Sequence, residues 1–259
     1  MSTVQTNVFD LTGQLALVTG SSRGIGRALA AGLAQAGATV VVHGRNLEAV
    51  NATARQIAEG IGSTVHANSF DVTDEAAVDA ALGEIEASLG VPDILVNNAG
   101  MQLRAPLADF SLADWHTLVD TNLTSAFLMA RRVARGMIER GSGRIINIGS
   151  VQSSLARPNI TPYAATKGGI AMLTRGLCAE LAPHGITANT LAPGYFSTEL
   201  TAALVADEEF SQWVAQRTPA GRWGQVEDLV GPLVFLASDA ARFVNGQTLY
   251  VDGGMTSVV

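Results

Sequence analysis

The sequence has a single cysteine, Cys178, among its 259 residues. One cysteine excludes a disulfide framework and any zinc site built on cysteines, and it is typical of a protein from a reducing compartment. The four histidines, His43, His66, His116 and His184, show no metal-ligand spacing. We therefore expect no metal site.

Basic residues are also scarce, since 16 Lys and Arg stand against 23 Asp and Glu, for a net charge of −7. This balance speaks against broad nucleic-acid binding, which needs a basic surface. No apolar run approaches the ~18 residues that cross a membrane. Residues 1–10 lack the charged start and apolar stretch of a signal peptide. We expect a cytoplasmic protein with no nucleic-acid or membrane partner.

Apolar, β-branched runs alternate along the chain with longer stretches rich in Ala and Leu. This alternation is typical of a parallel sheet with helices on both faces. It predicts one α/β domain over residues 1–259, doubly wound and Rossmann-type, with a parallel seven-stranded sheet. Strands are expected at residues 15–20, 38–43, 64–70, 93–97, 144–148, 187–191 and 247–251, and helices at 24–35, 47–59, 75–89, 112–139, 163–181 and 226–237. The irregular stretch 194–223 is expected to be a substrate-binding loop or lid.

Glycines follow the first expected strand with the spacing G-x-x-x-G-x-G, from Gly20 to Gly26. Such a turn lets the backbone approach a pyrophosphate, and the next helix offers free N–H groups to it. The second strand ends at Arg45 with no acid nearby, where enzymes that prefer NAD place Asp or Glu. Arg23 and Arg45 would suit the 2′-phosphate of NADP. The alternative is that both are solvated surface arginines.

Asp71 ends the third expected strand. Its carboxylate could accept a hydrogen bond from an adenine amino group. Alternatively, Asp71 or Thr73 could cap the helix that follows, since both residue types are good N-caps. The sequence leaves both interpretations open.

Tyr163 and Lys167 are four residues apart on an expected helix, so they share one face. Such a pair alone is usually a surface pair, but Ser150 and Asn122 could complete a site. A phenol is a poor base at neutral pH, and a neighbouring ammonium and a cationic nicotinamide would lower its pKa. The serine could hold a substrate oxygen, and the asparagine could anchor a water that carries the proton away.

Together these motifs resemble the short-chain dehydrogenase/reductase family over essentially the whole chain. The resemblance rests on the glycine loop 19–26, residues 97–100 (Asn-Asn-Ala-Gly), Asn122, Ser150, residues 163–167 and Pro193-Gly194. It implies an oxidoreductase in which the nicotinamide carries the hydride. With Arg23 and Arg45, the expected cofactor is NADP. Tyr163 would be the acid/base, Lys167 its electrostatic partner and ribose ligand, Ser150 the donor to the substrate oxygen, and Asn122 the water anchor.

The resemblance and the residues together also define a cofactor site and an assembly. The expected cofactor-binding residues are Gly20, Ser22, Arg23, Gly24, Ile25, Gly26, Arg45, Asn46, Asp71, Val72, Asn98, Ala99, Gly100, Tyr163, Lys167, Pro193, Gly194, Phe196 and Thr198. The family further implies a homotetramer. Its contact surfaces would be the helices at 112–139 and 163–181 and the last strand.

A closer resemblance covers the loops in which family members usually differ, at residues 100–106, 150–158, 193–196, 206–210 and 218–224. These loops are similar to those of members that act on a sugar acid, a small molecule with a carboxylate and several hydroxyls. Arg104 or Arg157 could pair with the carboxylate, Arg104 being the first choice, unless each is a surface arginine held by an acid. The other expected substrate residues are Ser150, Gln152 and Tyr195.

Two other functions remain open. One is reduction of a 3-oxoacyl group on a carrier protein, or of another sugar or polyol. The other is a non-catalytic nucleotide sensor on the same fold. The acidic run 207–209 speaks mildly against an acidic carrier protein, and the joint presence of Asn122, Ser150, Tyr163 and Lys167 speaks against a sensor.

Overall fold

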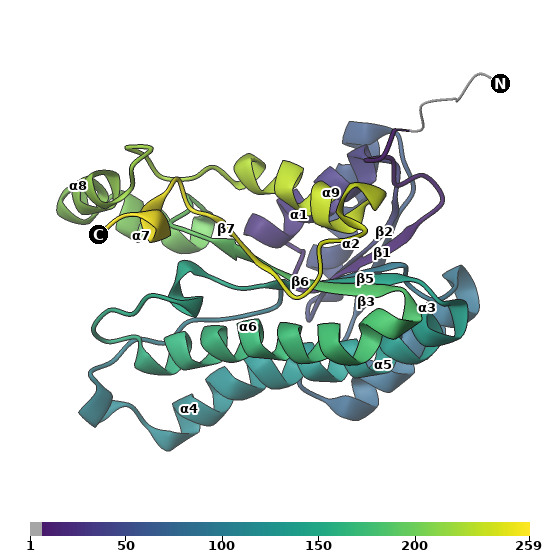
Figure 1. The fold of residues 1–259 in the computed structure, drawn as a ribbon, viewed down its shortest axis with the longest axis horizontal. Helices are drawn as coiled ribbons and strands as arrows, with labels where there is room; N and C mark the ends of the chain where they lie inside the picture. The colour runs from purple at the N-terminus through teal and green to yellow at the C-terminus, as the bar shows by residue number, and fades with distance from the viewer. Residues whose placement is uncertain (1–6) are drawn as a thin grey trace.

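Seven parallel strands form one sheet in the order β3-β2-β1-β4-β5-β6-β7 (Figure 1). The computed structural model describes residues 7–259. Residues 1–10 were the basis for expecting no signal peptide, and the first six of them lie outside the described residues. The strands are β1 (Leu15–Val18), β2 (Thr39–Gly44), β3 (Val65–Ser69), β4 (Ile94–Asn97), β5 (Gly143–Ile148), β6 (Ile186–Pro193) and β7 (Thr248–Val251). The predicted doubly wound fold is confirmed, and its strand order reverses between β1 and β4.

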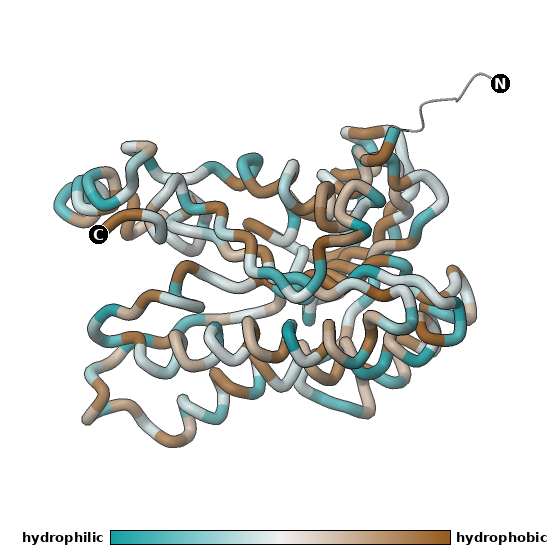
Figure 2. The backbone as a smooth tube through the Cα atoms, in the orientation of Figure 1, coloured by the Kyte–Doolittle hydropathy of each residue, from teal (hydrophilic) through white to brown (hydrophobic). Residues whose placement is uncertain are grey.

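Helices cover both faces of the sheet (Figure 1). One layer holds α1 (Gly24–Gln35), α2 (Leu47–Ile61) and α9 (Val230–Ala237), and the other holds α3 (Glu75–Leu89), α5 (Ser125–Arg140) and α6 (Thr161–Leu181). Alternate residues of β1 feed the two cores, Ala16 and Val18 on one face and Leu15 and Leu17 on the other. Figure 2 shows the apolar stretches along these central strands.

Local signals set the ends of several helices. Asn46 caps α2 by accepting a hydrogen bond from the Ala49 N–H (2.9 Å), and Gly62 ends that helix at a φ of 72°. Asp74 caps α3 through the Ala76 and Ala77 N–H groups. Of the two interpretations of Asp71, the one in which Asp71 or Thr73 caps this helix is therefore wrong.

The structure corrects three further expectations. The helix predicted at 112–139 is two helices, α4 (Leu112–Val119) and α5, joined by a π-helical segment at Asp120–Thr124. The stretch 194–223 is largely helical, with α7 (Ala202–Val205) and α8 (Glu208–Arg217), because Asp207 caps α8. The helix predicted at 226–237 begins as a 3-10 turn, and α9 follows only from Val230, with Pro232, which lacks an N–H, in its first turn.

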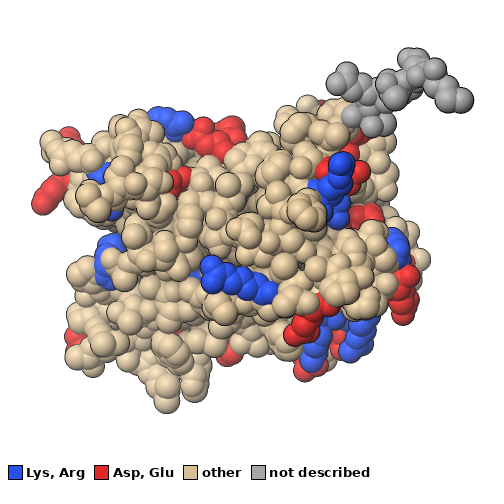
Figure 3. Space-filling model, viewed as in Figure 1, with Lys and Arg blue, Asp and Glu red and all other residues tan. Residues whose placement is uncertain are grey.

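Within residues 7–259, every helix is too short or too polar to cross a membrane. On the face shown in Figure 3, lysine and arginine side chains are scattered among acidic ones rather than gathered in one patch.

Candidate active site

The glycine loop between β1 and α1 packs tightly against the residues that follow β4. A Cβ on Gly20 would lie 2.8 Å from the Ala99 Cα, and one on Gly26 would lie 2.4 Å from the Asn98 Nδ2. Gly20 also adopts a φ of 61°, which favours glycine. No side chain from the described part of the chain caps the start of α1, so its first N–H groups remain available to phosphate oxygens. This turn fits a dinucleotide pyrophosphate.

The segment at 97–100 holds the glycine loop in place. The Asn98 Nδ2 donates to the carbonyls of Thr19 (2.9 Å) and Gly20 (3.0 Å). The backbone N–H groups of Asn98 and Ala99 donate to the Thr19 Oγ1, each at 3.0 Å. The motif thus acts on the cofactor site by fixing the shape of the loop.

The two arginines predicted for a 2′-phosphate are both exposed, Arg23 at the start of α1 and Arg45 after β2. Neither forms an ion pair within the described residues. The pKa of Asp71 is lowered, chiefly by the hydrogen bond from the Thr73 N–H, and the charge of Arg45 adds to this effect. Asp71 and Arg45 are therefore neighbours at the adenosine side of the predicted site.

Some predicted cofactor residues have side chains that are already engaged. Val72 and Phe196 lie in the two hydrophobic cores. The Asn46 side chain caps α2, and Thr198 caps a short turn by accepting from the Thr201 N–H (3.3 Å). A cofactor would meet these positions mainly through their main-chain atoms.

Helix α6 presents Tyr163 and Lys167 on one face, as the spacing predicts. The Lys167 Nζ lies 5.8 Å from the centre of the Tyr163 ring. The lysine is buried and donates from Nζ to the Ile148 carbonyl at 2.8 Å, at the end of β5. Burial lowers the pKa of Lys167 to about 8. The lysine is thereby fixed beside both the tyrosine and the strand that carries the serine.

Burial also raises the pKa of the Tyr163 phenol. The nearby Ser150 hydroxyl and the positive charge of Arg104 act in the opposite direction, whereas Tyr195 raises it further. Ser150, Tyr163 and Arg104 therefore lie within reach of one another. A protonated phenol at neutral pH is the state that can donate a proton to a substrate oxygen.

Ser150 follows β5 and starts a short turn. Its Oγ accepts from the Gln152 N–H at 3.1 Å. Ser153, which sequence reasoning missed, donates from Oγ to the Lys167 carbonyl (2.9 Å) and accepts from the Ser150 N–H (3.3 Å). The Ser153 side chain thus joins the turn that starts at Ser150 directly to α6.

Asn122 lies in the π-helical segment and is buried. Its Oδ1 accepts from the Met101 N–H (2.8 Å), and its Nδ2 donates to the Met101 carbonyl (2.9 Å) and the Thr166 Oγ1 (3.2 Å). Both Nδ2 hydrogens are thus used to join the loop after β4 to α6. The side chain anchors these segments, and its role as a water anchor stays a prediction.

The predicted substrate residues lie close together. Burial lowers the pKa of Arg104, and the charge of Arg157 lowers it further. Both arginines also lower the pKa of Tyr195, against the effect of its burial. Neither arginine is paired with an acid within the described residues. The Gln152 Oε1 and the Arg157 Nε are buried and have no hydrogen-bond partner among residues 7–259. Buried groups of this kind usually have partners, so both point to a polar ligand.

Aromatic side chains of the 194–223 stretch support this cluster. Tyr195 packs edge-on against Phe210, Trp213 and Trp223, with ring centres 5.6–5.9 Å apart. The Arg157 guanidinium lies 5.8 Å from the Phe210 ring centre. The stretch therefore forms an aromatic wall next to the two arginines.

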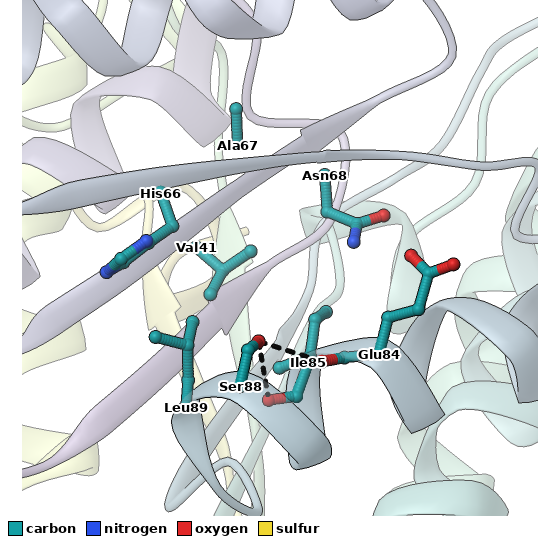
Figure 4. Close-up of a pocket in the computed structure, with 8 residues that line it drawn as sticks. All are labelled: Val41, His66, Ala67, Asn68, Glu84, Ile85, Ser88 and Leu89. Atoms are coloured by element: carbon teal, nitrogen blue, oxygen red, sulfur yellow. Dashed lines mark hydrogen bonds between the residues drawn. The ribbon is translucent and has the colours of Figure 1, made fainter.

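A separate surface pocket of about 170 Å³ lies between the β3 edge of the sheet and α3 (Figure 4). His66 and Asn68 face it from the strand, and Ser88 faces it from the helix. The Ser88 hydroxyl donates back to the Glu84 and Ile85 carbonyls. Its lining contains no predicted site residue.

The chain is similar to proteins of known name over almost its whole length. A family model described as enoyl-(acyl carrier protein) reductase matches residues 20–256. The chain is 55% identical over 250 residues to gluconate 5-dehydrogenase of Gluconobacter oxydans (strain 621H), covering 96% of this chain and 97% of the relative. It is 47% identical over 254 residues to 5-keto-D-gluconate 5-reductase of Escherichia coli (strain K12), covering 98% and 99%.

A solved structure is similarly close. The crystal structure of a gluconate 5-dehydrogenase from Burkholderia cenocepacia J2315 in complex with NADP and tartrate matches with a TM-score of 0.95 and 58% identity. The match covers 97% of this chain and 98% of that chain. The names of these relatives agree with the sugar-acid resemblance that the variable loops carry.

Proposed function

The chain belongs to the short-chain dehydrogenase/reductase family, and within it we propose an NADP-dependent enzyme that interconverts D-gluconate and 5-dehydro-D-gluconate. The observation that carries this proposal is that Tyr163 and Ser150 lie near two arginines, Arg104 and Arg157, that form no ion pair within residues 7–259. Arg157 is half-buried and Arg104 is exposed, with its Nη2 donating to the Gln102 Oε1 at 3.0 Å. A carboxylate could pair with both guanidinium groups, whereas a neutral substrate would offer them no opposite charge.

The carbonyl chemistry follows from the residues around Tyr163. When bound, the nicotinamide supplies or accepts the hydride at the substrate carbon. In the reductive direction the Ser150 hydroxyl holds the carbonyl oxygen, and the Tyr163 phenol donates its proton to that oxygen. Lys167, held by the Ile148 carbonyl, stabilises the resulting phenolate. The reverse sequence removes the proton from the C5 hydroxyl of gluconate.

The polar end of the substrate is bound by a second group of residues. Arg104 and Arg157 hold the carboxylate, and the unpartnered Gln152 Oε1 accepts from a hydroxyl. The aromatic wall that includes Tyr195 closes this side, so the 194–223 stretch serves as the lid. Arg23 and Arg45 hold the 2′-phosphate of NADP.

We also propose that the enzyme acts as a cytoplasmic homotetramer. Apolar side chains exposed on α4, α5 and α6, among them Leu112, Phe127 and Met172, support contact between copies. The one cysteine, Cys178, is free, as suits a reducing compartment.

Product analysis tests the proposed reaction. The enzyme should oxidise D-gluconate with NADP, and NMR of the product should place the new carbonyl at C5. A carbonyl at C2, or no oxidation of gluconate beside turnover of a 3-oxoacyl thioester, would contradict the substrate assignment. A Tyr163→Phe variant should lose at least about a hundredfold in kcat. Full turnover by that variant would contradict the mechanism.

A further inference from the structure

We propose that His43, a residue with no part in the carbonyl chemistry, is a positioning residue that sets the glycine loop for dinucleotide binding. The proposal rests on the proposed function only in its cofactor, NADP. His43 is buried near the end of β2, where its side chain connects the glycine loop to the adenosine side of the site.

Hydrogen bonds link His43 both to the glycine loop and to the chain just after β3. The imidazole Nδ1 accepts from the Gly20 N–H at 3.1 Å. The His43 N–H donates to the Ser21 Oγ (2.9 Å), and its carbonyl accepts from the Ser21 N–H (2.8 Å). The other ring nitrogen, Nε2, is hydrogen-bonded to the Phe70 carbonyl at 3.0 Å. Phe70 immediately precedes Asp71, the predicted adenine acceptor.

These contacts fix the protonation state of the ring. Because Nδ1 accepts from an N–H, Nε2 must carry the one ring proton and donate it to the Phe70 carbonyl. The ring is buried, 2% exposed, and lies against the Phe70 ring at 4.1 Å between centres. The charged group that acts on it is Asp71, which follows β3 and itself feels the charge of Arg45.

The backbone bonds to Ser21 do not depend on the side chain, whereas the bond to Gly20 does. Gly20 is the loop residue whose Cα packs against Ala99, and its carbonyl accepts from Asn98. The imidazole therefore binds Gly20 from the β2 side, whereas Asn98 binds it from the β4 side. Loss of this bond frees the Gly20 N–H and loosens the turn that must fit the pyrophosphate.

Two substitutions separate the two ring bonds. In His43→Asn the Oδ1 occupies the place of Nδ1 and can accept from Gly20, whereas the bond to Phe70 is lost. In His43→Gln the terminal amide can donate to Phe70, whereas Gly20 loses its acceptor. A third variant, His43→Leu, removes both bonds. Ser238→Ala, which removes a buried hydroxyl at the far end of α9, is the control for a general loss of stability.

The test measures the Kd of NADPH by fluorescence, together with thermal unfolding without ligand and the KM and kcat for NADPH. We expect the Kd and KM for NADPH to rise about tenfold or more in the Gln and Leu variants, with kcat within about twofold of wild type. The Asn variant should stay within about threefold in Kd. Ser238→Ala should lower the melting temperature and leave the Kd unchanged.

Three other outcomes would contradict different parts of the account. An unchanged Kd in the Gln variant, with a lowered melting temperature, would make His43 an ordinary core residue and overturn the proposal. A rise in Kd in the Asn variant equal to that in the Gln variant would overturn the role of the Gly20 bond. Binding of NADPH by the wild type without turnover of 5-keto-D-gluconate would contradict only the substrate part of the proposed function.

Discussion

At the scale of single residues, burial decides the chemistry of the site. Tyr163 is predicted from its spacing to Lys167, but the burial that keeps its phenol protonated is a property of the fold. Lys167 is similar, because its contact with the Ile148 carbonyl depends on how α6 packs on β5. Sequence reasoning found these side chains. It missed Ser153 and His43, since single serines and histidines carry no signal until their neighbours are known.

The two arginines give a prediction about substrate charge. Arg104→Gln should raise the KM for D-gluconate at least about tenfold, because a charge-assisted hydrogen bond to the carboxylate is lost. The KM for an uncharged polyol should change much less. Steady-state oxidation of both substrates by the variant measures this, with the exposed Arg175→Gln as control. Equal effects on the charged and the uncharged substrate would contradict the assignment.

His43 also gives a prediction about pH and stability. Burial lowers the pKa of His43 from 6.5 to about 4, so between these values the unfolded chain binds a proton that the folded protein does not. The contribution of neutral His43 to the free energy of unfolding is complete above pH 6.5 and is lost as the pH falls to about 4. The shift corresponds to ~3 kcal/mol in the free energy of unfolding.

Urea unfolding between pH 7 and pH 4 tests this sign. The stability of the wild type should fall more steeply than that of His43→Asn, and by roughly the same ~3 kcal/mol. His184→Asn, on an exposed turn, is the control and should follow the wild type. Parallel profiles for wild type and His43→Asn would contradict the assigned burial.

At the scale of elements, the sequence predicts the regular parts well and the irregular parts poorly. The ends of α1 and α3 match the predicted 24–35 and 75–89, because glycines and Asp74 mark them. The π-helical segment at Asp120–Thr124 has no such signal, since its side chains keep a helical pattern. Its extra residue is explained only in three dimensions, where Asn122 meets Met101 and Thr166.

The stretch 194–223 shows a related limit. Its helices, α7 and α8, are too short for a clear periodic pattern, and α7 has only four residues. The aromatic contacts between Tyr195 and Trp223 span most of the stretch and order it. The acidic run 207–209 predicts the start of a helix, and α8 begins there. Contacts between residues so far apart in the sequence do not show in local propensity, so the rest of the stretch was expected to be irregular.

The glycine loop gives a prediction at this scale. A Cβ on Gly26 would lie 2.4 Å from both the Asn98 Nδ2 and the Gly20 carbonyl oxygen. Gly26→Ala should therefore displace the loop and raise the Kd of NADPH by more than about tenfold. Gly60→Ala on α2, where a Cβ meets nothing within 4 Å, is the matched control and should bind as the wild type does. Wild-type binding by Gly26→Ala would contradict the proposed pyrophosphate turn.

At the scale of the whole molecule, the sheet brings its functional loops to one edge. The turns after β1, β4, β5 and β6 carry the glycine loop, the 97–100 segment, Ser150 and the lid. Parallel strands place their carboxyl ends together, which is why widely spaced motifs form one site. The alternation of strands and helices in the sequence predicts this gathering without any knowledge of side-chain contacts.

The outer surface gives a prediction about assembly. Leu112, Phe127 and Met172 are exposed on α4, α5 and α6, and contact between copies would bury them. Light scattering should give a particle of four times 26.8 kDa. Phe127→Asp should lower this mass, whereas Leu47→Asp, exposed at the start of α2, should leave it unchanged. A wild-type mass of one chain would contradict the tetramer.

The central claim is that this site reduces a sugar acid with NADPH. Its most direct test is NADPH oxidation with 5-keto-D-gluconate, measured beside 2-keto-D-gluconate, an acetoacetyl thioester and the same reactions with NADH. We predict that kcat/KM is highest for 5-keto-D-gluconate with NADPH by at least about tenfold over every other pair. Turnover of the thioester alone would leave the fold and the Tyr163 chemistry standing and would contradict the roles of Arg104 and Arg157.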